Sequence, residues 1–317
     1  MNRPALDPEL GALLASLPDF PPLDAETLPL MRPYASGLVE PLLATRDVIR
    51  REDTVTSADG SPLPITVISP AGAVSTVGAV GVLWLHGGGM VMGDRFSQLD
   101  IPLEWLDTLG AVVVTVDYRL APDVSGTTLV DDGYAALRWL ADNADDLGID
   151  PTRIVVAGTS AGGGIAAGVT LLARDRSTPA VAAQVLVCPM LDHRNDTASA
   201  HQFTAPAVWS RESNAFAWHA VTGGDAAPSP YVSPSLASDL SGLPPTYIDA
   251  GSAEVFRDED VDYASRIWAA GGAAELHVWS GGFHGFDALY PDAELSRAAR
   301  ATRTAWLERT LTRSHPV

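Results

Sequence analysis

A glycine-framed serine between a strand and a helix constrains this fold more than any other feature of the chain. Gly158-Thr159-Ser160-Ala161-Gly162 follows the β-branched run 154–157 and opens into the glycine- and alanine-rich segment 163–169. A strand that turns abruptly into a helix strains the exposed residue at its tip and leaves little room two residues to either side. Gly158 and Gly162 occupy those two positions, so we predict a nucleophile elbow that exposes Ser160.

A second glycine-rich element lies upstream of the elbow. The buried-strand pattern Val80–Leu85 runs into His86-Gly87-Gly88-Gly89. Three glycines after a strand weaken a fold unless close backbone approach or positive φ is required there. We predict an oxyanion hole in which the N–H groups of Gly88, Gly89 and Ala161 face a developing alkoxide, in preference to a flexible surface turn. His86 adjoins this turn, and we expect it to order the loop.

A candidate base lies near the other end of the chain. Gly281-Gly282-Phe283-His284-Gly285-Phe286 follows the apolar stretch Leu276–Trp279 and puts His284 at a strand-to-loop junction. The order of oxyanion loop, serine and histidine is the one that α/β hydrolases use. His201, His219 and His277 lack such glycine-framed loops, and we expect them to be surface or packing residues.

The acid of a triad must lie between the serine and the histidine in this order. The strand pattern at 245–250 is followed by a loop with several carboxylates. Asp249 falls inside the strand pattern, while Asp258 and Glu259 suit the first turn of a helix expected from Asp260 to Ala270. Glu254 lies in the loop beyond the strand end, and we predict it as the acid, with Asp258 as the alternative.

These motifs together resemble those of the bacterial hormone-sensitive-lipase-like (family IV) esterases of the α/β-hydrolase superfamily. The matching segments are His86–Gly89, Asp117–Pro122, the elbow and His284–Phe286, in that order, within a resemblance over about residues 50 to 312. The resemblance implies that Ser160 is the nucleophile, His284 the general base, and Gly88, Gly89 and Ala161 the oxyanion donors. It also implies a serine carboxylesterase that prefers short to medium acyl chains to long triglycerides.

The chain departs from the common family pattern at three positions. Thr159 stands where many members have Asp, Asp123 where Glu is usual, and Glu254 where Asp is the usual acid. The Gly-Thr-Ser-Ala-Gly elbow resembles a subgroup in which a glutamate acid is expected. Alignment of Glu254 on the first position of the family's Asp-Pro-Leu-Arg-Asp-Glu motif puts it on the triad acid.

The rest of the chain predicts an α/β-hydrolase fold with a helical cap. Residues 1–45 carry helix starts at Asp7 and Asp24 and no sheet pattern, so we expect helices that pack over another part of the fold. The resemblance implies that they are N-terminal cap helices. From 46 to 317, strands alternate with helices, including one expected over Leu129–Leu147, which predicts a mostly parallel sheet covered on both faces. An aromatic-rich segment at about 192–224 interrupts this alternation, and the resemblance implies that it is the cap insertion.

Two aromatic side chains of that insertion are candidate substrate-binding residues. We expect Phe203 and Trp209 to line an acyl pocket, although buried aromatics often only pack a core. The segment Asp192–Asp196 lacks a second His or Cys at ligand spacing, so we expect no metal there. We expect no cofactor, and a buried, inert thiol at Cys188, the only cysteine.

The charge balance excludes some partners. The net charge is −19, and every basic residue is arginine. Such charge argues against nucleic acid and anionic membrane surfaces. Salt adaptation would explain it, but compositional drift toward arginine and alanine explains it more simply. Residues Met1–Phe20 show no signal-peptide pattern, so we expect a cytoplasmic protein without a membrane span.

The expected partner is a small-molecule ester. A homodimer through an exposed edge strand or the helix near Ala298–Trp306 is a further expectation. The motifs specify acyl transfer but not the leaving group, so lactone, amide or aryl-acylamide cleavage stays open. A non-catalytic small-molecule receptor on this fold is the alternative from another class, and loss of the base would favour it.

Overall fold

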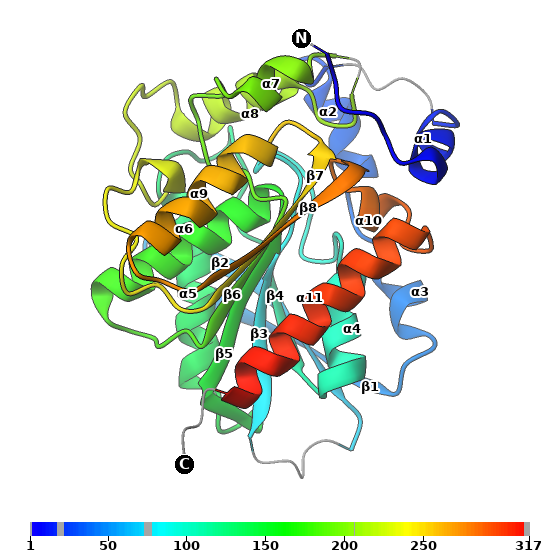
Figure 1. Cartoon of the computed structure of the whole chain (residues 1–317). Helices are drawn as coiled ribbons and strands as arrows, with labels where there is room; N and C mark the ends of the chain where they lie inside the picture. The colour runs from blue at the N-terminus through cyan, green and yellow to red at the C-terminus, as the bar shows by residue number, and fades with distance from the viewer. Residues whose placement is uncertain (1, 18–21, 73–77, 206, 314–317) are drawn as a thin grey trace.

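The computed structural model describes residues 2–17, 22–72, 78–205 and 207–313. One sheet runs through it in the order β1-β2-β4-β3-β5-β6-β7-β8 (Figure 1). The strands are β1 Val48–Thr56, β2 Pro62–Pro70, β3 Ala79–Leu85, β4 Val112–Val116, β5 Ile149–Thr159, β6 Ala183–Val187, β7 Thr246–Ala253 and β8 Ala274–Phe283. β2 pairs antiparallel with β1 and β4, and every other pairing is parallel. The predicted mostly parallel sheet is confirmed.

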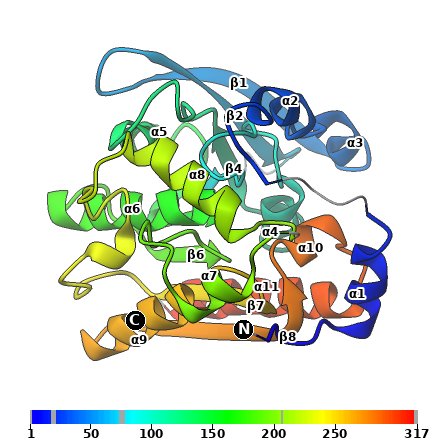
Figure 2. The same ribbon diagram turned by 90° about the horizontal axis from the view of Figure 1, so that it is seen from above.

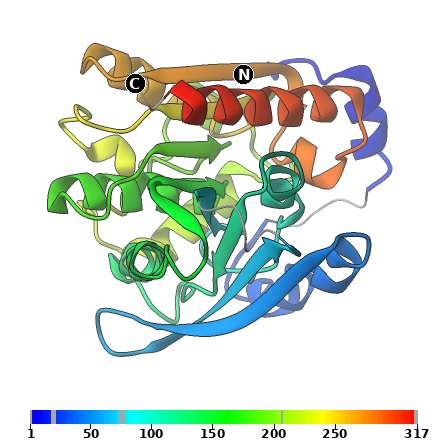
Figure 3. The same ribbon diagram turned by 90° about the horizontal axis from the view of Figure 1, so that it is seen from below.

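Helices cover both faces of the sheet, as predicted. They are α4 Asp100–Leu109, α5 Thr128–Asp142, α6 Ala161–Arg176, α9 Arg257–Ala269, α10 Phe286–Leu289 and α11 Glu294–Arg313. Alternate residues of β3 explain why both faces are apolar: Leu83 packs in one core with α5, α6 and α9, and Trp84 packs in another with α4 and α11. Figure 3 shows these two sets of helices on opposite sides of the sheet.

The segment between β6 and β7 carries α7 Ala198–Gln202, α8 Arg211–Thr222 and the short 3₁₀ helix η3 Pro234–Leu236. Viewed from above, α7 and α8 cross over the carboxyl ends of the parallel strands (Figure 2). The N-terminal region contributes α1 Pro8–Leu14, α2 Leu28–Met31, η1 Arg32–Tyr34 and α3 Val39–Leu43. No described helix is long and apolar enough to cross a membrane.

The N-terminal helices are spread over the molecule. The side chain of Asp7 caps α1 as predicted, and Leu10 of α1 packs with Phe283 and Phe286 at the β8 end of the sheet. Asp24 instead caps a turn, and the helix after it starts at Leu28. Val39 of α3 belongs to the core under α4 and α11. α3 therefore packs on the flank of the sheet rather than over its carboxyl edge.

Candidate active site

The elbow forms where β5 ends and α6 begins. Ser160 has φ 55° and ψ −122°, a strained conformation at the turn from strand to helix. A Cβ on Gly158 would lie 2.3 Å from the carbonyl oxygen of Gly162, and one on Gly162 would lie 2.1 Å from that of Leu85. Neither position therefore tolerates a side chain, in agreement with the sequence motif.

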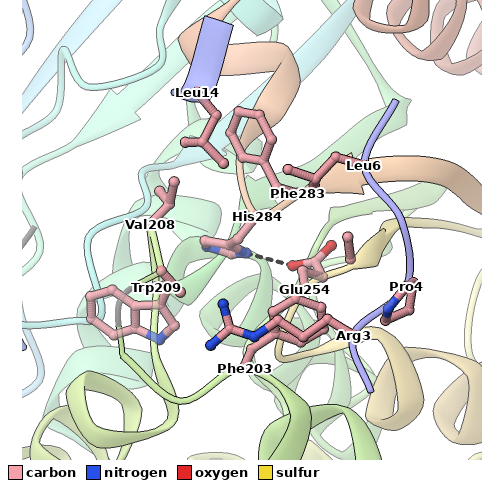
Figure 4. Close-up of a pocket in the computed structure, with 12 residues that line it drawn as sticks. Arg3, Pro4, Leu6, Leu14, Phe203, Val208, Trp209, Glu254, Phe283 and His284 are labelled. Atoms are coloured by element: carbon pink, nitrogen blue, oxygen red, sulfur yellow. Dashed lines mark hydrogen bonds and ion pairs between the residues drawn. The ribbon is translucent and has the colours of Figure 1, made fainter. Parts of the chain in front are cut away.

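Hydrogen bonds join three predicted site residues that are far apart in the sequence. Ser160 Oγ lies 2.9 Å from His284 Nε2, and His284 Nδ1 lies 2.5 Å from Glu254 Oε2. The other carboxylate oxygen of Glu254 accepts the Gly251 N–H at 2.6 Å. Glu254 is 1 % exposed, and Ser160 and His284 are each 9 % exposed. The strand ends of β5, β7 and β8 bring these side chains together (Figure 4 shows the Glu254–His284 contact).

The other carboxylates near Glu254 have different partners. Asp258 accepts the Ser199 N–H and pairs with Arg257. Asp249 pairs with the buried Arg303, and Glu259 accepts the N–H groups of two residues after β6. Among these four carboxylates, Glu254 is the one that contacts His284, whereas Asp258 bonds the start of α7.

The predicted oxyanion loop follows β3 beside the elbow. Gly88 and Gly89 have φ 120° and 64°, as a left-handed turn requires. Within the described part of the chain, the N–H groups of Gly88, Gly89 and Ala161 donate to no protein acceptor. Ala161 is the first residue of α6, where N–H groups are unpaired and the helix dipole favours negative charge. These donors are therefore available to an oxyanion near Ser160.

His86 is buried in the loop that it was expected to order. Its Nδ1 lies 2.7 Å from the Gly87 oxygen, and its ring stacks on Tyr118, whose hydroxyl donates to the His86 carbonyl at 2.7 Å. Burial lowers the pKa of His86, which favours the neutral ring. The contacts fit a residue that holds the glycine turn.

An apolar cavity of about 100 Å³ opens beside His284 and Glu254 (Figure 4). Phe203 and Trp209, the two predicted pocket residues, both line it. The sequence analysis did not predict the other apolar residues that line the cavity, which include Pro4, Leu6, Leu14, Val208 and Phe283. The sequence carried no signal for the first three, because their place depends on how the N-terminal segment crosses β8.

One group of side chains in the described residues has the spacing of metal ligands, and it coincides with the candidate active site. Possible ligand atoms of Cys188, Glu254 and His284 lie within 4.8 Å of one another, and no other such group occurs among the described residues. Both ring nitrogens of His284 are already hydrogen-bonded within the Ser160–Glu254 chain. Burial raises the pKa of the Cys188 thiol, as expected for a buried and unreactive cysteine. Asp192 is paired with Arg194.

The chain is similar to known esterases in both sequence and structure. The family model for the alpha/beta hydrolase fold matches residues 82–288. Esterase LipI of Mycobacterium tuberculosis is 32% identical over 287 residues, which cover 90% of this chain and 89% of that protein. Carboxylesterase NlhH of the same organism is 35% identical over 296 residues, again with 90% and 89% coverage. The solved structure of a bacterial heroin esterase matches with a TM-score of 0.85 and 36% identity, over 97% of this chain and 98% of that one.

Proposed function

Because this chain belongs to the α/β-hydrolase family, among the hormone-sensitive-lipase-like esterases, and is a carboxylic ester hydrolase, we propose that it works through an acyl-enzyme on Ser160. The substrates are small-molecule esters with short to medium acyl chains. The observation that carries this proposal is the unbroken hydrogen-bonded chain from Ser160 Oγ through His284 to Glu254.

The first half of the reaction forms the acyl-enzyme. His284 Nε2 takes the proton of Ser160 Oγ as the oxygen attacks the ester carbonyl carbon. The N–H groups of Gly88, Gly89 and Ala161 stabilise the resulting oxyanion. Glu254 fixes the tautomer of His284 and stabilises the imidazolium. The tetrahedral intermediate then collapses, and His284 returns the proton to the departing alcohol.

The second half repeats this chemistry with water. His284 removes a proton from a water molecule, which attacks the acyl carbon, and Ser160 Oγ leaves with the proton from His284. The free carboxylic acid departs. A receptor without catalysis is not retained, because the base is present and the family members named above are esterases.

The proposed acyl chain length rests on the size and lining of the cavity beside His284. A cavity of about 100 Å³ with apolar walls suits a short alkyl group better than a long one. Phe203 and Trp209 form part of its wall, and we assign them to the acyl pocket.

The experiment that tests the mechanism is a burst assay on p-nitrophenyl esters of increasing acyl length. Wild-type protein should release a stoichiometric burst of p-nitrophenol, and Ser160→Ala should abolish it. Ser265→Ala is a matched control, because that serine is exposed on α9 and its hydroxyl bonds the Val261 carbonyl of the same helix. A burst that survives Ser160→Ala contradicts the assignment, and turnover of amides or lactones without turnover of esters would move the protein to the other acyl-transfer chemistries.

We propose further that the N-terminal segment and residues 192–224 form one cap over the site. Arg3 Nε donates to the Gln202 carbonyl at 2.8 Å, and its guanidinium lies 5.4 Å from the Phe203 ring centroid. Gln202 returns a hydrogen bond to the Asn2 carbonyl at 2.9 Å. These contacts tie the segment that carries Pro4 and Leu6 to the cap insertion.

Arg3→Ala tests that arrangement. Loss of the Arg3 contacts with Gln202 and Phe203 should let the cavity wall move. KM for the shortest esters should then rise, and kcat/KM for longer acyl chains should increase. The melting temperature should change little, because Arg3 is exposed. Steady-state kinetics over the ester series and thermal unfolding measure both effects. An unchanged chain-length profile would argue against a shared cap.

A further inference from the structure

Three buried side chains of the cap form a hydrogen-bonded chain that ends on the indole of Trp209. Trp209 Nε1 donates to Asn214 Oδ1 at 3.2 Å, and Asn214 Nδ2 donates to Asn195 Oδ1 at 3.0 Å. Asn195 Nδ2 then donates to the Arg211 carbonyl at 2.9 Å. Asn214 is fully buried, Asn195 is 5 % exposed and Trp209 is 8 % exposed.

The indole N–H decides which group donates and which accepts in every hydrogen bond of this network. An indole N–H can only donate, so Asn214 must turn its oxygen to Trp209 and its NH₂ group to Asn195. Asn195 must then accept with its oxygen and donate with its own NH₂ group to a carbonyl. A flip of either amide would bring donor against donor and acceptor against acceptor inside a buried site, and buried polar groups without partners destabilise a fold. The network therefore has one favourable arrangement.

The far end of the chain joins two parts of the cap. Arg211 is the first residue of α8, and its guanidinium Nε donates back to the Asn195 carbonyl at 3.2 Å. Asn195 itself has φ 51°, a conformation that asparagine adopts more readily than most residues. The loop after β6 and the start of α8 are thereby held in register with the indole.

Trp209 lies where a small movement would change the site. It lines the cavity with His284 and Glu254 (Figure 4). A Cβ on Gly89 would lie 2.4 Å from Trp209 Cη2, so the indole edge rests directly against the oxyanion loop. A tilt of the ring would therefore alter the space beside the loop without touching Ser160, His284 or Glu254.

We propose that Asn214 and Asn195 are positioning residues that set the acyl-length preference of the enzyme by holding the Trp209 indole against the oxyanion loop. The inference rests on the proposed function, because it assigns the wall next to Gly89 to the acyl pocket. Neither asparagine touches the substrate. Both act through the orientation of one aromatic ring.

A purely structural role for the network predicts something different. If the asparagines only stabilise the cap, their loss lowers the melting temperature and the fraction of active enzyme, and it affects all esters equally. If they orient Trp209, their loss changes the ratio of kcat/KM between long and short esters. The ratio is independent of the active fraction, so it separates the two roles.

The test is a double-mutant cycle with Asn214→Ala and Trp209→Phe. Phe has no N–H, so it removes the same hydrogen bond from the other side. We measure kcat and KM for p-nitrophenyl acetate, butyrate, hexanoate and octanoate, together with the burst amplitude. Each single variant should change the octanoate-to-acetate ratio of kcat/KM by about fivefold or more, as expected for one buried neutral hydrogen bond. In the Trp209→Phe background, Asn214→Ala should add little.

Two further variants keep the test decisive. Asn195→Gly removes the second amide and retains freedom for positive φ, so it should shift the ratio in the same direction if Asn214→Ala fails to fold. Asn143→Ala is the matched control, because Asn143 bonds the Trp139 carbonyl at the end of α5, outside the cap. It should leave the ratio unchanged.

The outcomes separate this inference from the proposed function. The inference is overturned if the octanoate-to-acetate ratio of kcat/KM stays at the wild-type value in both Asn214→Ala and Asn195→Gly. It is also overturned if Asn214→Ala shifts this ratio as much in the Trp209→Phe background as in the wild-type protein. In both cases a burst that depends on Ser160 would leave the acyl-enzyme mechanism intact. Absence of any burst in the wild-type protein would instead overturn the proposed function.

Discussion

Glu254 meets His284 through one carboxylate oxygen and the Gly251 N–H through the other. Glu254→Gln would put an amide NH₂ group against one of these donors and favour the wrong imidazole tautomer. We therefore expect kcat to fall by about 10³- to 10⁴-fold. Asp258→Asn is the matched control, because Asp258 bonds Ser199 and Arg257 and not His284. It should lower kcat only a few-fold. Steady-state kinetics on p-nitrophenyl butyrate measure both, and a severe loss for Asp258→Asn with a mild one for Glu254→Gln would transfer the role to Asp258.

At Gly88, the addition of a side chain should lower kcat strongly. Its φ is 120°, and an added Cβ would lie 2.2 Å from the Met92 carbonyl oxygen. Gly88→Val must therefore displace the oxyanion loop, and loss of one donor lowers kcat by about 10²- to 10³-fold with little change in KM. Gly60→Ala is the control, because Gly60 also has positive φ but nothing within 4 Å of an added Cβ. Unchanged kcat in Gly88→Val would show that the hole is assigned wrongly.

At the scale of the element, α9 carries a buried carboxylate without a partner. Asp260 is fully buried, and neither of its carboxylate oxygens has a hydrogen-bond partner among the described residues. Burial raises its pKa well above the usual range, so the folded protein holds a proton that the unfolded chain releases at lower pH. The free energy of unfolding should therefore fall as the pH rises from the unfolded pKa of Asp through the raised folded value.

Asp260→Asn should remove this fall in the free energy of unfolding with rising pH, because the amide does not ionise. The variant should be more stable than wild type, and the difference in melting temperature should grow as the pH rises from about 4 toward 8. Thermal unfolding over this range measures it. Asp262→Asn is the control, because Asp262 is exposed on the same helix and should leave the difference flat. A difference that is constant or shrinks with pH would contradict a buried, protonated Asp260.

At the scale of the whole molecule, self-repulsion should limit stability. The net charge is −19, while most ion pairs of the described residues are partly exposed and contribute little each. Added NaCl screens repulsion between exposed charges, so the melting temperature should rise between about 0.01 and 0.5 M salt. Matched sucrose is the control for general exclusion effects. A fall in melting temperature would mean that attraction between surface charges dominates.

Two whole-molecule expectations stay predictions. The cytoplasmic location is one, and the homodimer is the other. β8 forms one edge of the sheet, and an edge strand can pair with a second copy, although the Asp7 N–H already bonds the Gly281 carbonyl of β8.

The core of the fold could be predicted because its signals are local. The buried strands, the glycines of the elbow and the order of the motifs each reflect a short-range requirement of backbone geometry. Element ends were less accurate. The helix expected to end at Leu147 ends at Asp142, because Asn143 caps it by bonding the Trp139 carbonyl. Ala144 is still buried in the turns that follow, so apolar spacing continues past the helix.

The sequence by itself determined which residue types could do acyl transfer and in what order they occur, since the strained turn at Ser160 and the loop at Gly88 admit few alternatives. Only the tertiary structure decided which carboxylate reaches His284, which N-terminal residues wall the cavity, and what holds Trp209. These contacts join segments separated by as many as about 280 residues, such as Leu6 and His284. Spacing along the chain carries no information about such contacts until the sheet has brought the strand ends together.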